Sequence, residues 1–484
     1  MLYLFIYFSF LFSSNLYFEA DPFYLFYHES EQFDTNEYNV DLNIRPAFKS
    51  DYDNQMSLSY NAWYYYNDNV PNLENTSNRF VSMGSNLYNS LHFDYFNDFL
   101  YFSIEPYFFT SENLQFPIYY YTDQYDQLLP AEHTDPMFQA LNHGPSSTDG
   151  YFINYGLRES QIIIHKNSIG IGLSNANMWW GPGIHNSLHM SNNTSGFNHF
   201  FLGTTSEKKV KSFGYNLKYV FSKLDKNIAE PYYTGLAGDV TYYGDQITTI
   251  GFFRSFLSGG SLSSDDISLT ESMLLPFESF FKKNLYEDNN NEDPSDQVDQ
   301  TFSVFMSTLI PEYNLKVYFE IGWDDHRWDI YDFFQHPDHS ATKLLGFRKY
   351  GLFNNKNLIV GVEYTDLVTG RYPNRLKETN ETSIWYGRDL FDYNLYDGRR
   401  FTAHSGTDSD DLLFHLGYLS DKNDIILSIN HERHGVYESV LLSNEENFSS
   451  EGTLYVPEYK LEFKIDARKK YKNYDIYFMY EFEY

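Results

Sequence analysis

The sequence predicts an all-β protein, a transmembrane antiparallel β-barrel, and two observations carry this prediction. In the final segment, Tyr474–Tyr484, one face of a strand would hold only apolar side chains, namely Ile476, Phe478, Tyr480, Phe482 and Tyr484. The opposite face is largely polar, as in a barrel strand with lipid outside and a wet lumen inside. The second observation is that aromatic residues make up 20% of the chain, although its mean hydropathy is −0.51. Aromatic girdles and a lipid-facing surface account for so many rings in so polar a chain.

Residues 1–20 are expected to be a signal peptide. Residues 1–12 are nearly all apolar, too short a run for a membrane-spanning helix and the right length for a signal-peptide core. Ala20 is a small residue suited to the end of a cleaved segment. The segment departs from the usual pattern because the first basic residue is Arg45, and the alternative interpretation is an ordinary strand. Residues 21–484 are then expected to form a single barrel domain.

Between the two ends, strand-length segments of alternating apolar and polar residues are separated by polar turns. About fifteen such segments are recognisable, and a barrel tolerates weak ones because each strand is short and half polar. The final segment also resembles the C-terminal insertion signal of bacterial outer-membrane barrels. The other predicted strands are Asn39–Phe48, Gln55–Tyr65, Asn86–Phe96, Phe99–Phe109, Gln161–Leu173, Ser212–Phe221, Ile247–Phe256, Thr301–Ile310, Asn314–Trp323, Asn357–Leu367, Asp411–Leu419, Asp424–Asn430, Glu438–Ser443 and Thr453–Ala467.

Residues 264–284 break the strand pattern. The segment opens with Ser264 and two aspartates, which suit a helix N-terminus. Apolar residues then follow near-helical spacing, although Pro276 interrupts it. We expect a short helical insertion packed on a loop or inside the lumen. Residues 286–300, which come next, are too acidic and Asn-rich to be buried, and they predict a long outer loop.

The most specific motif lies in Asn177–Asn193, which reads NMWWGPGIHNSLHMSNN. A Gly-Pro-Gly sequence allows a tight, irregular backbone, and two large rings precede it. Polar residues beyond the turn alternate with Leu188 and Met190 to give one hydrogen-bonding face. Rings beside amides and hydroxyls suit a sugar, whose C–H face stacks on aromatics. The candidate ligand-binding residues, acting directly or by shaping the loop, are Trp179, Trp180, Gly181, Pro182, Gly183, Ser187, His189, Ser191, Asn192 and Asn193. The alternative is that the tryptophans pack a girdle or plug and the polar residues merely line the lumen.

The same motif resembles the signature of the Wzi-type capsule assembly family, outer-membrane proteins that help to hold polysaccharide at the cell surface. The resemblance implies a barrel of about 18 strands, a plugged lumen and a lectin-like role. Family members can carry a periplasmic helical bundle near the N-terminus, but no helical period is evident there, so none is predicted. The family's asparagines are usually followed by Ala and a Pro-containing turn, whereas this chain has Thr194–Phe197. Weaker matching pieces follow in order at Asp299-Gln300, Val317–Glu320, Glu363–Thr365, Trp385-Tyr386 and Ser405-Gly406.

Composition and motif searches exclude several other functions. The net charge is −32, from 66 acidic and 34 basic residues, so nucleic acid is excluded as a partner. The chain has no cysteine, which excludes disulfides and thiolate metal sites. Asp and His residues gather in Trp323–His339, but their spacing matches neither HExxH nor an EF-hand. We therefore expect no specific metal site and no cofactor there, but either a solvated loop or a calcium-bridged contact with an anionic glycan. A GxSxG elbow is also missing, and we expect no enzyme activity.

Two functions remain open at this stage. In the first, an outer-membrane, lectin-like barrel binds capsular or exopolysaccharide and retains it at the cell surface. In the second, the chain is an outer-membrane porin or substrate-specific channel whose polar ladder lines an open lumen. The helical insertion and the many bulky tyrosines favour a plugged barrel. We expect a monomer that contacts outer-membrane lipids, with the polysaccharide export machinery as a candidate partner.

Overall fold

The computed structural model describes residues 4–12, 22–35, 42–46, 55–68, 74–114, 120–122, 128–130, 150–261, 267–281, 298–324, 341–368, 394–406, 409–434, 458–472 and 474–484. Within them the main sheet holds 19 strands. One of these, β12 (Lys208–Val210), pairs with a single neighbour, and the other 18 form the barrel wall. The wall strands are β1 (Leu4–Phe12), β3 (Gln55–Asn67), β4 (Gly84–Phe96), β5 (Leu100–Ser111), β8 (Phe152–Lys166), β9 (Ile169–Ser174), β11 (His199–Thr204), β13 (Phe213–Lys223), β14 (Tyr232–Tyr243), β15 (Ile247–Ser258), β16 (Val298–Ile310), β17 (Leu315–Asp324), β18 (Ala341–Leu352), β19 (Asn355–Asp366), β22 (Ser409–Leu419), β23 (Asn423–His434), β24 (Glu458–Lys470) and β25 (Asp475–Glu483).

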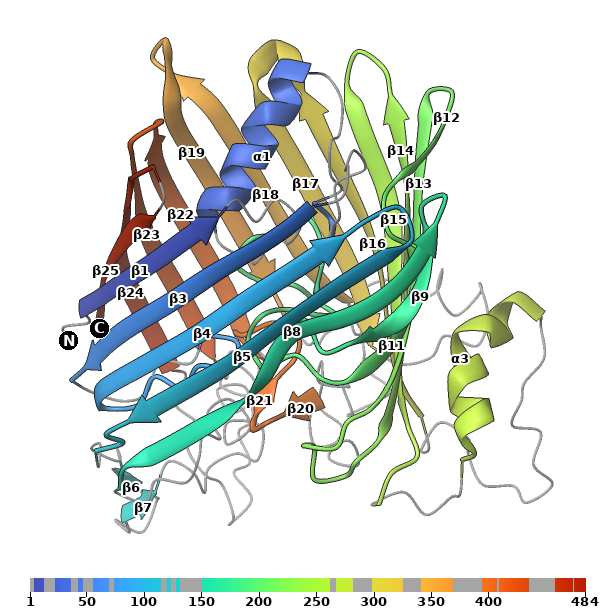
Figure 1. Ribbon diagram of the computed structural model, residues 1–484, viewed down its shortest axis with the longest axis horizontal. Helices are drawn as coiled ribbons and strands as arrows, with labels where there is room; N and C mark the ends of the chain where they lie inside the picture. The colour runs from blue at the N-terminus through green and yellow to red at the C-terminus, as the bar shows by residue number, and fades with distance from the viewer. Residues whose placement is uncertain are drawn as a thin grey trace, which may run out of the picture.

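The antiparallel pairings run round the wall and return to their start through β1. One edge of β1 pairs with β25, with Phe5 opposite Met479, and the other edge pairs with β3, with Phe8 opposite Ala62 (Figure 1). Residues 4–12 thus take the position of a wall strand in this structure, whereas a signal peptide would be removed on export. N-terminal sequencing of the protein taken from the membrane therefore decides between the two interpretations. Cleavage after Ala20, which lies outside the described residues, stays a prediction.

The two faces of the wall differ in polarity, as the alternating sequence predicts. In β22 the exposed side chains are Leu412, Phe414, Leu416 and Tyr418, whereas the intervening Asp411 and His415 are buried. The same alternation brings apolar residues to the outside of β4, β18 and β23. A closed sheet satisfies its backbone hydrogen bonds internally, so an apolar outer belt suits lipid. The predicted all-β transmembrane barrel is thus confirmed, with 18 wall strands.

No helix among the described residues is long and apolar enough to cross a bilayer.

Short turns and long connections alternate between the two ends of the barrel. At one end, the short-turn end, β18 and β19 are joined by Phe353-Asn354 alone, and both residues have positive φ angles. At the other end, the long-loop end, the connection from β19 to β22 spans residues 367–408. In bacterial barrels the short turns face the periplasm and the long loops face outward. The two ends therefore have distinct environments.

An unpredicted helix, α1 (Pro22–Thr35), lies inside the lumen at the short-turn end (Figure 1). Its Phe23, Phe26 and Phe33 pack against apolar wall residues from β15, β16, β18, β19, β22 and β23. These phenylalanines share one helical face, but Tyr24, Leu25 and Tyr27 are interspersed among them and obscure the period, which is why the sequence did not reveal the helix. After α1, residues 42–46 run deeper into the lumen as β2 (Ile44–Arg45). The predicted wall strand Asn39–Phe48 is therefore wrong, because only this two-residue strand forms among its described residues and it pairs inside the lumen.

The predicted helical insertion is present as α3 (Leu269–Phe281), but it lies on the outer face of the wall. Tyr219 of β13 points outward, because its neighbour Val220 packs in the lumen. The Tyr219 hydroxyl donates to the Met273 carbonyl at 2.8 Å, and its ring stacks on Phe277. Figure 1 shows α3 beside the barrel. The expectation that this helix packs on a loop or inside the lumen is therefore wrong, because the helix packs on the outside of the barrel wall.

The remaining differences from the predicted elements are local. Gln161–Leu173 was predicted as one strand, but a tight turn at Asn167-Ser168, both with positive φ, divides it into β8 and β9. The predicted acidic loop 286–300 ends earlier, because β16 begins at Val298; residues 286–297 and the predicted strand Glu438–Ser443 lie outside the described residues. Strands β11, β14 and β18 were not predicted. The small elements are β6 (Tyr120–Thr122), β7 (Leu128–Pro130), η3 (Pro311–Tyr313), β10 (Trp179–Trp180), β20 (Leu395–Tyr396) and β21 (Arg399–Arg400).

Candidate functional site: the lumen plug

Segments from several loops meet inside the lumen and form what we call the plug. The plug consists of residues 42–46, which enter from the short-turn end, and residues 74–82, 175–198 and 394–406, which enter from the long-loop end. The Ser77 amide donates to the Asn192 carbonyl at 2.7 Å, and the Ser191 amide donates to the Phe401 carbonyl at 2.9 Å. The three loops from the long-loop end are therefore bonded to one another as well as to the wall.

The Trp-Trp-Gly-Pro-Gly motif meets the N-terminal segment at the centre of the plug. Strands β10 and β2 pair antiparallel, with Trp180 opposite Ile44. Gly181 has a φ of 147°, and a Cβ atom there would lie 2.9 Å from the Glu320 carboxylate. At Gly183 a Cβ atom would lie 2.4 Å from the Asn186 carbonyl oxygen. Gly181 is favoured by its positive φ, which side-chain-bearing residues rarely adopt, and Gly183 is needed because a side chain would collide with the backbone.

Both tryptophans are buried in the plug. Trp179 is 2% exposed and Trp180 is 1% exposed. The Trp180 ring stacks on Phe253 of β15, with ring centroids 6.0 Å apart, and it belongs to an apolar core inside the barrel. The Arg45 guanidinium lies 4.8 Å from the Trp179 ring centroid, a cation–π contact. Neither ring offers a face to a polymer in this arrangement, because both are buried inside the plug.

A single wall carboxylate fixes the loop that follows the glycines. Glu363 of β19 accepts hydrogen bonds from the backbone amides of Ile184 at 2.8 Å, His185 at 3.0 Å and Asn186 at 2.9 Å. The Tyr318 hydroxyl donates to the same carboxylate at 2.7 Å. Successive amides that converge on one anion satisfy the buried charge and define the loop backbone.

The predicted polar ladder is present, but its hydrogen bonds go to the protein itself. The Ser187 hydroxyl donates to the Trp180 carbonyl at 2.5 Å, and the Ser191 hydroxyl donates to the Thr402 carbonyl. His189 Nδ1 lies 3.0 Å from the Ser255 hydroxyl of the wall, and Asn193 Nδ2 donates to the Arg400 carbonyl at 3.0 Å. Burial lowers the pKa of His189 to about 3, so its ring is neutral.

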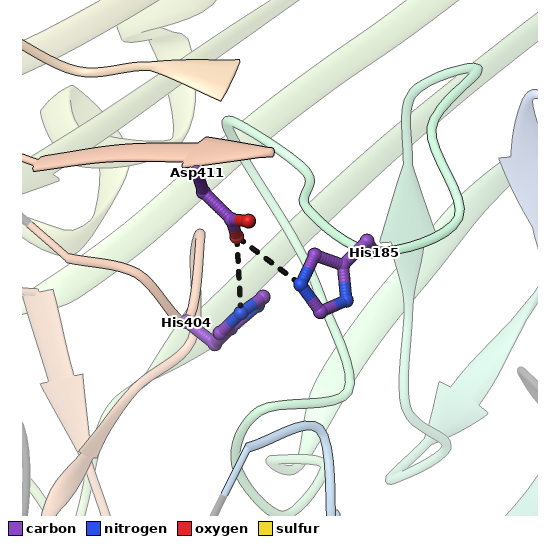
Figure 2. Close-up of side chains that lie close together, drawn as sticks. All are labelled: His185, His404 and Asp411. Atoms are coloured by element: carbon purple, nitrogen blue, oxygen red, sulfur yellow. Dashed lines mark ion pairs between the residues drawn. The ribbon is translucent and has the colours of Figure 1, made fainter. Parts of the chain in front are cut away.

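Two histidines and an aspartate converge at the edge of the plug. His185 Nε2 lies 3.2 Å from Asp411 Oδ2, and His404 Nε2 lies 3.4 Å from the same oxygen (Figure 2). The centroids of the two imidazole rings are 4.4 Å apart. Burial alone would lower the pKa of His185, but the Asp411 carboxylate outweighs burial and raises it to about 9. These three residues come from two plug loops and one wall strand.

The structure therefore brings the ten predicted site residues together in one buried loop, in which Asn192 alone is partly exposed. Thr194 begins the segment in which this chain differs from the usual family pattern. Its hydroxyl donates a hydrogen bond to the Tyr396 carbonyl at 2.5 Å. The Asp/His-rich segment 323–339 lies outside the described residues beyond Asp324. Sequence reasoning missed the group of His185, His404 and Asp411, because no spacing along the chain links residues so far apart.

Comparisons with known proteins agree with this architecture. The family model described as capsule assembly protein Wzi matches residues 71–483. No curated protein matches the chain. One solved structure is described as Wzi, an outer membrane protein involved in group 1 capsule assembly in Escherichia coli and a carbohydrate-binding β-barrel. It is 11% identical, has a TM-score of 0.57, and the match covers 94% of this chain and 97% of that one. A structure of Pseudomonas putida OprB is 6% identical with a TM-score of 0.36, and the match covers 100% of this chain and 93% of that one.

Proposed function

Because the chain belongs to the Wzi family of capsule assembly proteins, we propose that it is a lectin-like barrel that binds capsular or exopolysaccharide and retains it at the cell surface. Its closed wall and apolar belt, together with the family, make it an outer-membrane protein. The observation that carries the proposal is the filled lumen. The role is non-catalytic, and the partners would be the polysaccharide, the surrounding lipids and the export machinery.

Two apolar cores within the lumen argue against the alternative of an open channel. The first surrounds Trp180 and includes wall residues such as Phe253 and Phe305. The second lies at the short-turn end, where Phe26 of α1 packs in the same core as Tyr350 and Ile359. A porin lumen is lined by polar side chains and filled with water. An interior that buries aromatic rings from both ends suits a binding platform better than a passage.

Planar-bilayer recording separates the two functions. A plugged barrel should show little or no single-channel conductance, because apolar side chains of the plug and of α1 pack against the wall inside the lumen. A general porin reconstituted in the same bilayers serves as the control for successful insertion. Large, stable conductance steps from this barrel, at the same detergent and salt concentration, would refute the plugged, lectin-like interpretation and favour the channel.

We place polymer binding at the long-loop end, because long loops of outer-membrane barrels face outward. Within the predicted motif, Asn192 is the residue suited to direct contact. It is partly exposed, and its side chain makes no hydrogen bond among the described residues. The other nine residues would act by holding the loop in shape. Each sugar contact competes with water and contributes about 1 kcal/mol or less per hydrogen bond. Retention then depends on many polymer repeats meeting many barrels.

Neighbouring asparagines provide a matched pair for the test. Asn193 is buried, donates to the Arg400 carbonyl and accepts from the Asn75 amide at 3.2 Å. Asn192→Ala should release polymer into the medium while the amount of folded barrel stays the same. Asn193→Ala should lower the amount or heat stability of folded barrel and leave retention per folded barrel unchanged. Cell-bound polymer is measured against heat-modifiable protein in the outer membrane. Unchanged retention in Asn192→Ala would rule out this residue as the contact.

The net charge of −32 predicts which polymers bind directly. Like charges repel at low ionic strength, so a neutral polysaccharide should bind through hydrogen bonds alone. An acidic polysaccharide should require a bridging divalent cation such as Ca²⁺. Binding of a neutral and an acidic polymer to purified barrel, each with Ca²⁺ and with a chelator, measures this difference. Equal, chelator-insensitive binding of both polymers would contradict the electrostatic part of the proposal.

A further inference from the structure

We propose that His185, His404 and Asp411 form a site for a divalent transition-metal ion, with Zn²⁺ as the best fit, and that the ion fastens the plug to the barrel wall. The three candidate ligand atoms all lie within 4.8 Å of one another. Two imidazoles and a carboxylate are ligands typical of zinc and its neighbours, whereas calcium and magnesium prefer an all-oxygen set. This proposal reverses the expectation from the sequence that the chain has no metal site, and it does not rest on polysaccharide binding.

The distances between the ligand atoms suit one shared ion. Asp411 Oδ2 lies 3.2 Å from His185 Nε2 and 3.4 Å from His404 Nε2. Ligands about 2.0–2.1 Å from a tetrahedral zinc lie about 3.3–3.4 Å from each other. In Figure 2 the two rings approach the carboxylate from different sides, with a nitrogen of each directed at it. The arrangement can receive an ion once the Asn430 side chain turns aside, because its Nδ2 atom lies 2.6 Å from His185 Nε2.

Unused hydrogen-bonding atoms at the same place give the second, independent observation. The His404 side chain is fully buried, and its Nε2 atom makes no hydrogen bond, although a carboxylate oxygen lies 3.4 Å away. Asp411 Oδ1 is also buried without a hydrogen-bond partner. A buried polar atom without a partner destabilises the folded state. A metal ion would use these lone pairs directly, because imidazole nitrogens and carboxylate oxygens bind metals through their lone pairs.

Neighbouring side chains are placed to orient the ligands. Asn186 Nδ2 donates to Asp411 Oδ2 at 2.6 Å, and Asn75 Nδ2 lies 3.3 Å from His404 Nδ1. Such partners hold ligand side chains in the binding geometry. Among the described residues, a further carboxylate lies close by on Glu74, with Oε2 3.7 Å from His404 Nε2. It could complete the coordination from the third loop of the plug.

The consequence is a cross-link between segments that are distant in the sequence. His185 lies in the loop between β9 and β11, His404 in the loop between β19 and β22, and Asp411 in the wall strand β22. An ion held by all three would limit the separation of both loops from the wall. Zn²⁺ should therefore protect the plug loops from protease in the folded barrel, and a chelator should remove this protection.

The test uses the full chain refolded in detergent from inclusion bodies, because lipopolysaccharide would carry divalent cations into the sample. After treatment with a chelator and its removal, Zn²⁺ alone is titrated and the bound metal is counted per heat-modifiable barrel. Co²⁺ serves as a spectroscopic probe of tetrahedral coordination. We expect one tightly bound ion per barrel and weakening by at least about tenfold in both His185→Gln and His404→Gln.

His92→Gln is the matched control. His92 is also buried between two carboxylates, but it meets them through different nitrogens, with Nε2 2.8 Å from Asp94 and Nδ1 2.9 Å from Glu105. Those ligand directions do not converge on one ion, so this variant should bind Zn²⁺ like the parent chain. If either ligand variant fails to fold, Asp411→Asn takes its place with the same readout. The proposal is overturned if the parent chain binds no stoichiometric Zn²⁺, or if the ligand variants bind as tightly as His92→Gln.

Discussion

Replacing Glu29 by alanine should release α1 from the lumen. Glu29 is fully buried on α1 and accepts hydrogen bonds from Lys316 Nζ at 2.5 Å and from Arg348 Nε at 2.6 Å. The Tyr350 hydroxyl donates to the same carboxylate at 2.5 Å. Without this carboxylate, two wall cations would remain buried with no counter-charge from the helix. The perturbation therefore removes the polar anchor of α1 and leaves its phenylalanines in place.

The magnitude follows from the cost of breaking a buried ion pair. Removing one partner from such a pair costs about 3–5 kcal/mol, because the other charge is left uncompensated. That cost corresponds to a shift of roughly 150-fold to 5,000-fold in the equilibrium between docked and undocked helix. An isolated helix of this length is marginal in water, so the undocked state should also be unfolded.

Amide hydrogen exchange of α1 in the folded barrel measures this equilibrium. Glu29→Ala should speed exchange across α1 by two orders of magnitude or more, while exchange in the wall strands stays the same. Glu31→Ala is the control, because Glu31 lies on the exposed side of the same helix. Replacing Glu29, Lys316 and Arg348 together by apolar residues should restore protection, since the buried charges disappear together. Unchanged exchange in Glu29→Ala would refute the idea that this ion cluster holds the helix.

The ion pairs of Glu29 with Arg348 and Lys316 should also make the docking of α1 depend on pH. Burial alone would raise the pKa of Glu29, but Arg348 and Lys316 outweigh burial and hold it far below its usual range. A carboxyl group with a depressed pKa stabilises the docked helix above the pKa of the undocked state, about 4.3, and this contribution is lost as the pH falls below that value. Protection of α1 should therefore be constant near neutral pH and decrease under acid conditions. A helix whose protection did not change between pH 6 and pH 3 would contradict the assignment.

Three further predictions concern the plug. Gly183→Ala should destabilise the folded barrel by about 1–3 kcal/mol, because the new Cβ atom would collide with the Asn186 carbonyl; Gly417→Ala, where the nearest atom is 3.6 Å away, is the control in urea unfolding. Trp180→Ala should cost about 3–5 kcal/mol by leaving a cavity beside Phe253, seen as a lower temperature of heat modification with unchanged polymer retention per folded barrel. His189 is neutral when folded, with a pKa of about 3, and ordinarily titrates near 6.5 when unfolded. Stability should therefore fall as the pH drops from about 6.5 towards 3, and His189→Gln should remove that part of the slope.

The wall was predictable because the signal for each strand is local. In β22 and β19 the lipid-facing residues recur at every second position, so a short window suffices to recognise the strand. Errors arose where that pattern is interrupted or continues across a turn. Asn167-Ser168 makes a tight turn between two runs of the same alternation, so β8 and β9 were predicted as one strand. In β14, Gly235 and Gly238 weaken the apolar alternation, and that strand was missed.

The plug was only partly predictable, because its contacts join residues that are distant in the sequence. The glycines and rings of the motif indicated an irregular loop with aromatic packing, but their spacing gave no sign that Glu363 would accept three of its amides. The hydrogen-bond partners of the polar ladder include Ser255 and Arg400, and these residues come close to the motif only in the folded barrel. The position of α1 depends on Glu29, whose ion-pair partners lie on β17 and β18. These partners are so distant in the sequence that no local pattern predicts the pairing.

The position of the plug has a consequence for how a weakly binding surface can retain polymer. Ordering a flexible loop during binding costs free energy that is subtracted from the affinity. Here the loop before Asn192 is already fixed by Glu363, by the pairing of β10 with β2 and by the stacking of Trp180 on Phe253. A surface held in this way loses little entropy when a polymer repeat binds. Many such barrels can then hold one chain through contacts that are individually weak.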